Sequence, residues 1–204
     1  MSEQNCLSDM IGEILSSRTP RFFDDKASTT YRHAGVLLPL LEEDDVCKVL
    51  FTERSDRVEH HKGQISFPGG AVDEEDMSIE ETVLRETNEE IGLTEDCIEI
   101  LGRIDDTLTV ASNYIVHPVV GFISRIDDLA TNPDEVKKVI KAPLHFFHPT
   151  VSGDKKFSVE YEGVIYRTPS YEYGGHVIWG ATAKMMRNFI EIIGDKLCLP
   201  SRQK

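Results

Sequence analysis

Cysteines are few in this 204-residue sequence, and long apolar runs are absent. The four cysteines lie far apart and form no CxxC pair; they are Cys6, Cys47, Cys97 and Cys198. That spacing argues against a disulfide framework or a zinc site, and it favours reduced thiols in a cytoplasmic protein. No segment approaches the roughly 20 apolar residues that cross a bilayer, so we expect no membrane partner. The terminal sequences lack the features of a signal peptide or of a retention signal.

Basic residues are also scarce. Lys and Arg together number 22 against 36 Asp and Glu, which gives a net charge of −14. Because phosphate backbones are bound by Lys and Arg, this balance argues against a nucleic-acid partner. A small phosphorylated substrate is still compatible with it, since a bound divalent cation inverts the local field.

The hydrophobic pattern predicts one domain that mixes strands and helices. Residues 34–41 and 47–53 read as the two strands of a hairpin joined by the acidic turn EEDD, and QISFPGG reads as a short strand ending in a Gly-Gly turn. Further strands are predicted at 98–104, 114–123, 157–162 and 163–168, and helices at 7–17, 78–91 and 180–193. We therefore expect an α+β domain over residues 31–195, preceded by a helix and linker at 1–30 and followed by a tail at 196–204.

The predicted helix at 78–91 carries a crowded set of carboxylates. It begins with an S-x-x-E capping box, and Gly92 follows its end. On a helical wheel Glu86, Glu89 and Glu90 fall within an arc of roughly 100°. Like charges four residues apart, close to the negative end of the helix dipole, destabilise a helix. The cluster is therefore either a solvated acidic face or a site for a hard divalent cation, which takes carboxylate and phosphate oxygens as ligands.

The stretch from Gly70 to Leu93 resembles the Nudix box, which reads G, five residues, E, seven residues, R-E-apolar-x-E-E-x-G-apolar. Every fixed point of its second half matches: Arg85, Glu86, Glu89, Glu90 and Gly92, with Leu93 as the final apolar residue. Thr87 stands where an aliphatic residue is usual, and the early acid is Asp76, with eight residues before Arg85. The resemblance implies a Nudix-type α/β/α sandwich with a mixed central sheet, the 78–91 helix on one face and the 180–193 helix on the other.

The same resemblance implies hydrolysis of a small-molecule diphosphate with Mg²⁺ or Mn²⁺ as cofactor. Glu86 and Glu90, one turn apart, would be the principal metal ligands, and Glu89 would complete the site. Arg85 would fix the orientation of a glutamate through its planar fork. The proton of the attacking water would pass to one of the three glutamates or to an acid on a loop.

Residues 50–70 resemble the coenzyme A pyrophosphatase subfamily, whose signature is similar to L-L-T-x-R-S-x3-R-x3-G-x3-F-P-G-G. The matching positions are Leu50, Thr52, Arg54, Ser55, Gly63, Phe67, Pro68, Gly69 and Gly70, whereas Glu59 stands where the second Arg is expected. The stretches NYIVHPVVGFI and VIWGATA are also similar to this subfamily. The resemblance implies that coenzyme A or its thioesters are cleaved to 3′,5′-ADP and a 4′-phosphopantetheine species.

The resemblance places the substrate-binding residues in the same stretch: Arg54, Ser66, Phe67, Gly69 and Gly70. Arg54 would contact the 3′-phosphate or the diphosphate of such a substrate, with Arg57 as a second nearby cation. The two glycines would let the backbone turn tightly and approach metal or phosphate.

Several other side chains have a structural interpretation. Phe67 and Trp179 are expected to pack in the core rather than to stack on adenine. His117 lies in an apolar strand and is expected to be packed, while His60 and His61 are expected to be loop residues without a catalytic role.

Other functions remain open at this stage. The same chemistry could act on another nucleoside diphosphate compound, such as ADP-ribose or a dinucleotide, or the fold could be a non-catalytic nucleotide-binding module. The intact carboxylate set favours an enzyme over a binding module. The sequence also leaves a homodimer open.

Overall fold

The predicted hairpin lies at the centre of the molecule. The computed structural model describes residues 3–23, 31–58, 61–109, 112–126, 129–161 and 163–194. Strands β1 (Arg32–Glu43) and β2 (Val46–Arg54) pair antiparallel, with Leu40 opposite Val49. The turn between them places Asp44 and Asp45 at φ 56° and 58°, a left-handed conformation that Asp tolerates better than most residues. The hairpin prediction is confirmed.

The central sheet is mixed, as predicted. β1 runs parallel to β7 (Tyr114–Ile123), and every other pairing is antiparallel: β7 with β5 (Ile98–Arg103) and β6 (Thr107–Thr109), and β2 with β8 (Val136–Pro143). β6 and β8 were not predicted. β6 is only three residues long, and the three lysines of β8 interrupt the alternation of apolar and polar residues by which a strand is predicted.

The strands β1 and β2 diverge toward one end of the sheet, and the FPGG segment lies between them. The short strand β3 (Ile65–Ser66) pairs with β2, and β4 (Gly69–Ala71) pairs with β1. The tight turn at Pro68 thus ties the two diverging strands together, and its carbonyl accepts a hydrogen bond from the Leu37 N–H at 2.9 Å. This fork positions the candidate site described below.

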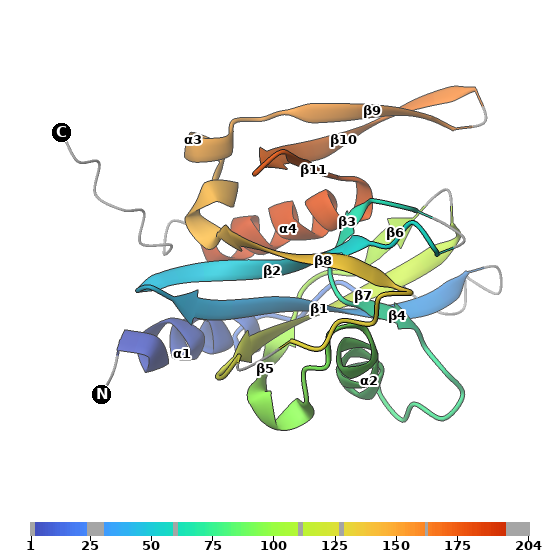
Figure 1. Cartoon of the computed structure of the whole chain (residues 1–204). Coiled ribbons are helices and arrows are strands. Elements are labelled where there is room, and N and C mark those ends of the chain that lie inside the picture. The colour runs from blue at the N-terminus through green and yellow to red at the C-terminus, as the bar shows by residue number, and fades with distance from the viewer. Residues whose placement is uncertain are drawn as a thin grey trace.

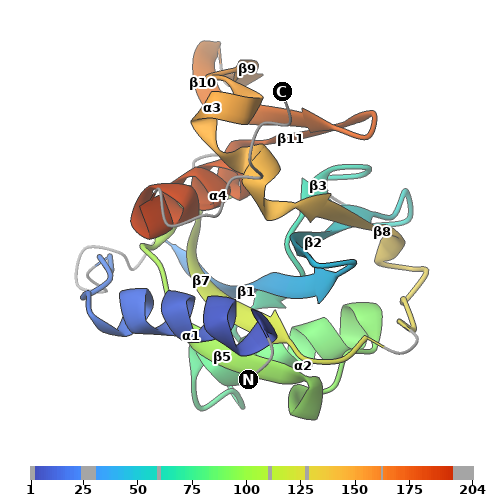
Figure 2. The same cartoon turned by 90° about the vertical axis from the view of Figure 1, so that its left-hand side faces the viewer.

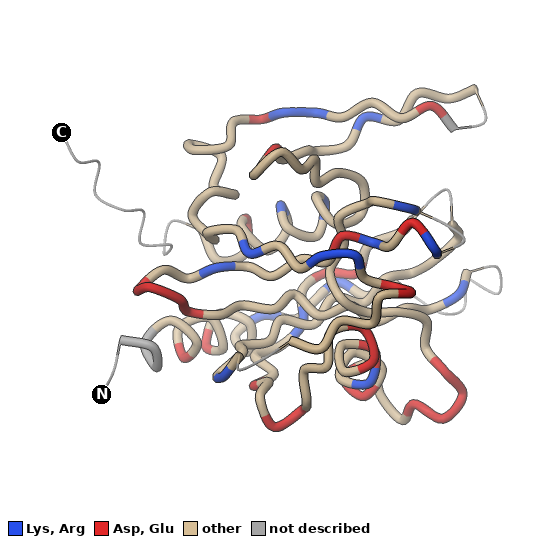
Figure 3. Tube along the Cα trace, viewed as in Figure 1, with Lys and Arg blue, Asp and Glu red and all other residues tan. Residues whose placement is uncertain are grey.

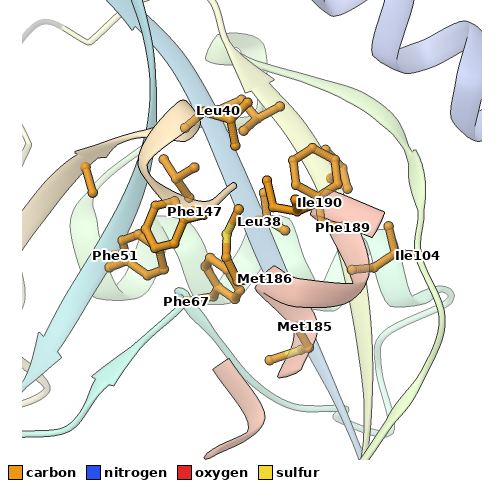
Figure 4. Close-up of a cluster of buried hydrophobic side chains, with 14 of the residues drawn as sticks. Leu38, Leu40, Phe51, Phe67, Ile104, Phe147, Met185, Met186, Phe189 and Ile190 are labelled. Atoms are coloured by element: carbon orange, nitrogen blue, oxygen red, sulfur yellow. The ribbon is translucent and has the colours of Figure 1, made fainter. Parts of the chain in front are cut away.

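Helices cover both faces of the central sheet (Figures 1 and 2). Alternation along β1 sends Leu37 to the cluster under α2 (Ile79–Ile91) and Leu38 to the cluster under α4 (Gly180–Ile193). α1 (Glu3–Ser16) adds Ile11 to the α4 side, where it packs beside β5. Figure 4 shows the aromatic centre of that larger cluster. The predicted α/β/α sandwich is confirmed.

A second, three-stranded sheet lies beyond α4. It consists of β9 (Lys156–Tyr161), β10 (Val164–Tyr173) and β11 (His176–Trp179) in the order β11-β10-β9. α4 lies between it and the central sheet (Figure 1). The strands predicted at 157–162 and 163–168 are therefore present, but β10 is longer than predicted and β11 was not predicted.

Short helical segments complete the described chain. They are η2 (Glu95–Cys97), η3 (Leu144–Phe147) and α3 (Pro149–Ser152). In the part of the chain that the structure describes, none of the helices combines the length and apolarity needed to span a membrane.

Candidate active site

Helix α2 forms where its capping signals predict. The Ser78 side chain accepts a hydrogen bond from the Glu81 N–H at 3.2 Å, and Gly92 ends the helix in the left-handed conformation at φ 71°. Val83 and Ile91 are fully buried against the sheet. Thr87, at the usually aliphatic position of the box, is also buried, and its hydroxyl is without a hydrogen-bond partner among the described residues.

Two paired glycines allow α2 to lie close to the sheet. Gly35 on β1 and Gly70 on β4 are register partners. A Cβ at Gly35 would meet Val83 Cγ2 at 2.9 Å, and a Cβ at Gly70 would meet the Glu86 carboxylate oxygens at 2.4 Å. Gly69 has φ 145°, and a Cβ there would lie 2.3 Å from the Gly35 carbonyl oxygen. Glycine at position 70 therefore lets the backbone approach Glu86, and glycines at 35 and 69 let β1 lie close to α2 and to the FPGG turn.

Arg85 is the hub of an ionic network around the start of α2. Its Nε and Nη2 donate to the two oxygens of Asp76 at 3.1 and 2.9 Å, and Nη1 donates to Glu86 at 2.9 Å. Nη2 also donates to the Ala71 carbonyl at 3.2 Å, and Nη1 lies 3.5 Å from Glu89. The forked contact with Asp76 holds the pKa of that buried carboxyl well below its usual range. Asp76 therefore anchors Arg85, although eight residues separate them where the Nudix box has seven.

Glu90 is the most buried carboxylate of the set. The residue is 2% exposed, and burial raises the pKa of Glu90 to about 8, although Arg54 and the Gly69 N–H partly offset that effect. Its Oε2 has no hydrogen-bond partner among the described residues. The pKa of Glu86 is raised by the same cause, against the opposing effect of Arg85. Two neighbouring carboxylates are thus held where negative charge is unfavourable.

These carboxylates fit a hard divalent cation. A cation would supply the partner that the buried Glu90 Oε2 lacks among the described residues, and it would lower the raised pKa values of Glu86 and Glu90. Among the described residues, no three acidic, His or Cys side chains already converge closely enough to hold a metal ion. The three glutamates do not converge because the Glu86 carboxylate is paired with Arg85 and the Glu89 side chain is 53% exposed.

An acid from outside α2 also faces this site. Glu135 precedes β8, and its negative charge contributes to the raised pKa of both Glu86 and Glu90. The Asn132 side-chain amide donates to its carboxylate at 3.0 Å. No periodic pattern or motif in the sequence marks Glu135, which lies in a polar loop far along the chain from α2.

Arg54 connects the carboxylates to a cavity. A bulge in the β2–β8 pairing lies at Glu53 and Arg54. Arg54 acts electrostatically on Glu90, and it also lines a cavity of about 330 Å³ between β3, β6, α4 and the second sheet. The Arg54 Nε is buried without a partner in the described part of the molecule. Ser66 lines the same cavity and shares a 3.1 Å hydrogen bond with the Thr52 hydroxyl.

Other predicted residues lie elsewhere. Phe67 is 2% exposed, and its ring stacks on that of Phe51 at 5.0 Å between centroids (Figure 4). It is therefore a core residue, and it is not among the described residues that line the cavity. Arg57 forms a surface ion pair with Asp134 at 2.8 Å. Trp179, expected in the core, is half-buried and lines the cavity.

The histidine predictions have mixed outcomes. His117 is buried, as predicted, with Nδ1 2.8 Å from Asp106 and Nε2 2.8 Å from Nδ1 of His33. His61 is a loop residue that contacts Gln64 and also lines the cavity. Glu59 and His60 lie outside the described residues.

Comparison with known proteins gives the family. A model of the NUDIX domain matches residues 31–158, and this chain belongs to the Nudix family. It is 35% identical over 189 residues to an uncharacterized Nudix hydrolase, NudL, of Photorhabdus laumondii, covering 91% of this chain and 96% of that one. A NudL of Yersinia pestis is 32% identical over 164 residues, covering 80% and 81%.

A solved structure agrees with the fold. A MutT/nudix family protein from Enterococcus faecalis superposes with a TM-score of 0.51 and 16% identity, covering 95% of this chain and 81% of that one. The family match and the NudL relatives define the chain as a Nudix hydrolase, a pyrophosphatase-type enzyme acting on a diphosphate compound.

Proposed function

We propose that this hydrolase cleaves the diphosphate of coenzyme A or its thioesters, using Mg²⁺ or Mn²⁺, to give 3′,5′-ADP and a 4′-phosphopantetheine species. The observation that carries the proposal is the position of Arg54, a residue of the LFTERS stretch. It acts electrostatically on the buried Glu90 of α2, and it also lines a cavity whose walls include apolar and aromatic side chains. A diphosphate held beside Arg54 would have its scissile region at the carboxylates and one organic half in the cavity.

Glu86, Glu89 and Glu90 would hold the metal, which supplies charge neutralisation on the diphosphate oxygens and a more acidic bound water. Arg85, anchored on Asp76, keeps the Glu86 carboxylate pointed at Gly70. Gly69 and Gly70 keep the backbone close to that carboxylate, and Ser66 lies at the cavity wall. Glu135 is the loop acid best placed to accept the proton of the attacking water, since it faces both buried glutamates.

We also propose a cytoplasmic location, in line with the free thiols of Cys47 and Cys97. Another nucleoside diphosphate compound, such as ADP-ribose or a dinucleotide, is the competing substrate class, because it shares the diphosphate and one nucleotide half with coenzyme A.

Product analysis tests the proposal directly. The protein is incubated with Mg²⁺ or Mn²⁺ and, separately, with coenzyme A, acetyl-coenzyme A, ADP-ribose and a diadenosine diphosphate, and the products are identified by mass spectrometry. We expect 3′,5′-ADP and a phosphopantetheine species from the first two, at a higher kcat/KM than for the others. Preferential cleavage of ADP-ribose or the dinucleotide would refute the coenzyme A assignment. Binding without turnover of any compound would instead indicate a binding module.

A further inference from the structure

The cavity beside Arg54 has an unusual charge for this molecule. The chain has a net charge of −14, and Figure 3 shows acidic segments along α2 and the loop before it. Among the described residues that line the cavity, however, none is Asp or Glu, whereas Arg54, His61 and Lys184 all line it. An acid-free, cationic cavity in so acidic a protein is suited to an anionic ligand.

Lys184 has no other role in the described structure. It is exposed on the first half of α4 and forms no ion pair or hydrogen bond with any described residue. Many other lysines of this chain are paired; Lys155, for example, lies 3.1 Å from Glu172. The first residues of α4, Gly180 to Thr182, belong to the same wall, so the positive end of the helix dipole adds to the charge of Lys184 there.

Aromatic and apolar side chains form part of the remaining wall. Trp179 and Tyr166 both line the cavity, with Leu108 and Val159. Trp179 is held in place by Phe157 of β9, at 5.0 Å between ring centroids. Aromatic rings at such a position offer a stacking surface to a nucleobase. The part of this wall that comes from β10, β11 and α4 lies beyond residue 158, where the match to the family model ends.

We propose that this cavity binds the nucleotide half of the substrate, with Lys184 contacting a phosphomonoester in addition to the diphosphate and with Trp179 and Tyr166 contacting the base. This inference rests on the proposed function. Arg54 serves the diphosphate, because it acts electrostatically on Glu90, and Lys184, which lines the same cavity from α4, serves the additional phosphate. The second sheet and α4 thereby select substrates whose nucleotide carries a third phosphate.

Equilibrium binding of product fragments tests this without turnover. The affinities of 3′,5′-ADP, 5′-AMP and 4′-phosphopantetheine are measured by calorimetry on the metal-free wild type, on Lys184→Met and on the control Lys155→Met. We expect the wild type to bind 3′,5′-ADP roughly tenfold more tightly than 5′-AMP, the scale of one charge-assisted contact. Lys184→Met should remove most of that preference while leaving 5′-AMP binding unchanged, and Lys155→Met should behave like the wild type.

Three outcomes of these binding measurements would overturn the inference: no preference for 3′,5′-ADP over 5′-AMP in the wild type, an undiminished preference in Lys184→Met, or tighter binding of 4′-phosphopantetheine than of 3′,5′-ADP. A lack of coenzyme A hydrolysis would instead refute the proposed function. Equal hydrolysis of coenzyme A and 3′-dephospho-coenzyme A by the wild type would reject the role of Lys184 and leave diphosphate hydrolysis in place.

Discussion

At the scale of single residues, Glu90 is a buried carboxyl whose Oε2 has no hydrogen-bond partner in the described part of the chain. Burial raises its pKa to about 8 from an ordinary value of 4.5. Between these two values the folded protein retains a proton that the unfolded chain has released. The free energy of unfolding of the metal-free protein should therefore fall as the pH rises from about 5 to 8.

Glu90→Gln tests both roles of this carboxylate. The amide keeps the shape but cannot ionise, so the contribution of Glu90 to the pH dependence should vanish in urea unfolding curves recorded in EDTA. Stability without metal at pH 8 should equal or exceed that of the wild type. Activity with Mg²⁺ should fall by at least roughly tenfold to a hundredfold. Near-wild-type turnover would remove Glu90 from the metal site.

Arg85 makes contacts that depend on the geometry of its guanidinium. It reaches both oxygens of Asp76 and also Glu86, which an ammonium group cannot reproduce. Arg85→Lys should lower kcat/KM by about tenfold or more and weaken the metal affinity measured by titration. Arg187→Lys, at the surface ion pair with Asp154, is the matched control and should leave both unchanged. Unaltered kinetics in Arg85→Lys would mean that the contacts of Arg85 do not contribute to catalysis.

At the scale of elements, the close contact between α2 and the sheet depends on the absence of a side chain at Gly35. A Cβ at Gly35 would clash with Val83 and approach the Ile79 carbonyl, so Gly35→Ala should displace α2 and cost about 1–3 kcal/mol of stability. At Gly12, in α1, a Cβ would meet nothing within 4 Å, and alanine there should stabilise by up to about 1 kcal/mol. Denaturant unfolding of both variants measures the difference. Equal effects of the two substitutions would argue against a close α2–β1 contact.

At the scale of the whole molecule, metal binding should stabilise the fold. A ligand at a hundredfold excess over its Kd adds about 2.7 kcal/mol, which for a chain of this length raises Tm by about 5 to 10 °C. Thermal unfolding with EDTA, Mg²⁺ and Mn²⁺ measures the shift. A variant with Glu86, Glu89 and Glu90 all changed to Gln should show almost none of it. A metal-induced shift of equal size in that variant would place the metal elsewhere.

Local patterns determined much of this protein. The start and end of α2, the central hairpin and the presence of α4 follow from capping residues, turn residues and apolar periodicity, all of which act over a few neighbouring positions. The spacing of Arg85, Glu86, Glu89 and Glu90 likewise predicted a carboxylate site on one helix, and the family comparison agrees with that class of enzyme.

Tertiary structure decided what surrounds that helix. The burial of Glu90 and the approach of Glu135 depend on packing between segments distant in sequence. The contact between Asp76 and Arg85 spans only nine residues, but it depends on how the loop before α2 folds back onto that helix. The same holds for the cavity, which needs β2, β6, β10 and α4 to meet. Packing between these elements also moved Trp179 from an expected core position to the cavity wall, and it placed Lys184 and Arg54 in the lining of one cavity. The physical reason is that hydrophobic patterns show which side of an element is buried, whereas the neighbour against which it is buried is fixed only when all elements pack together.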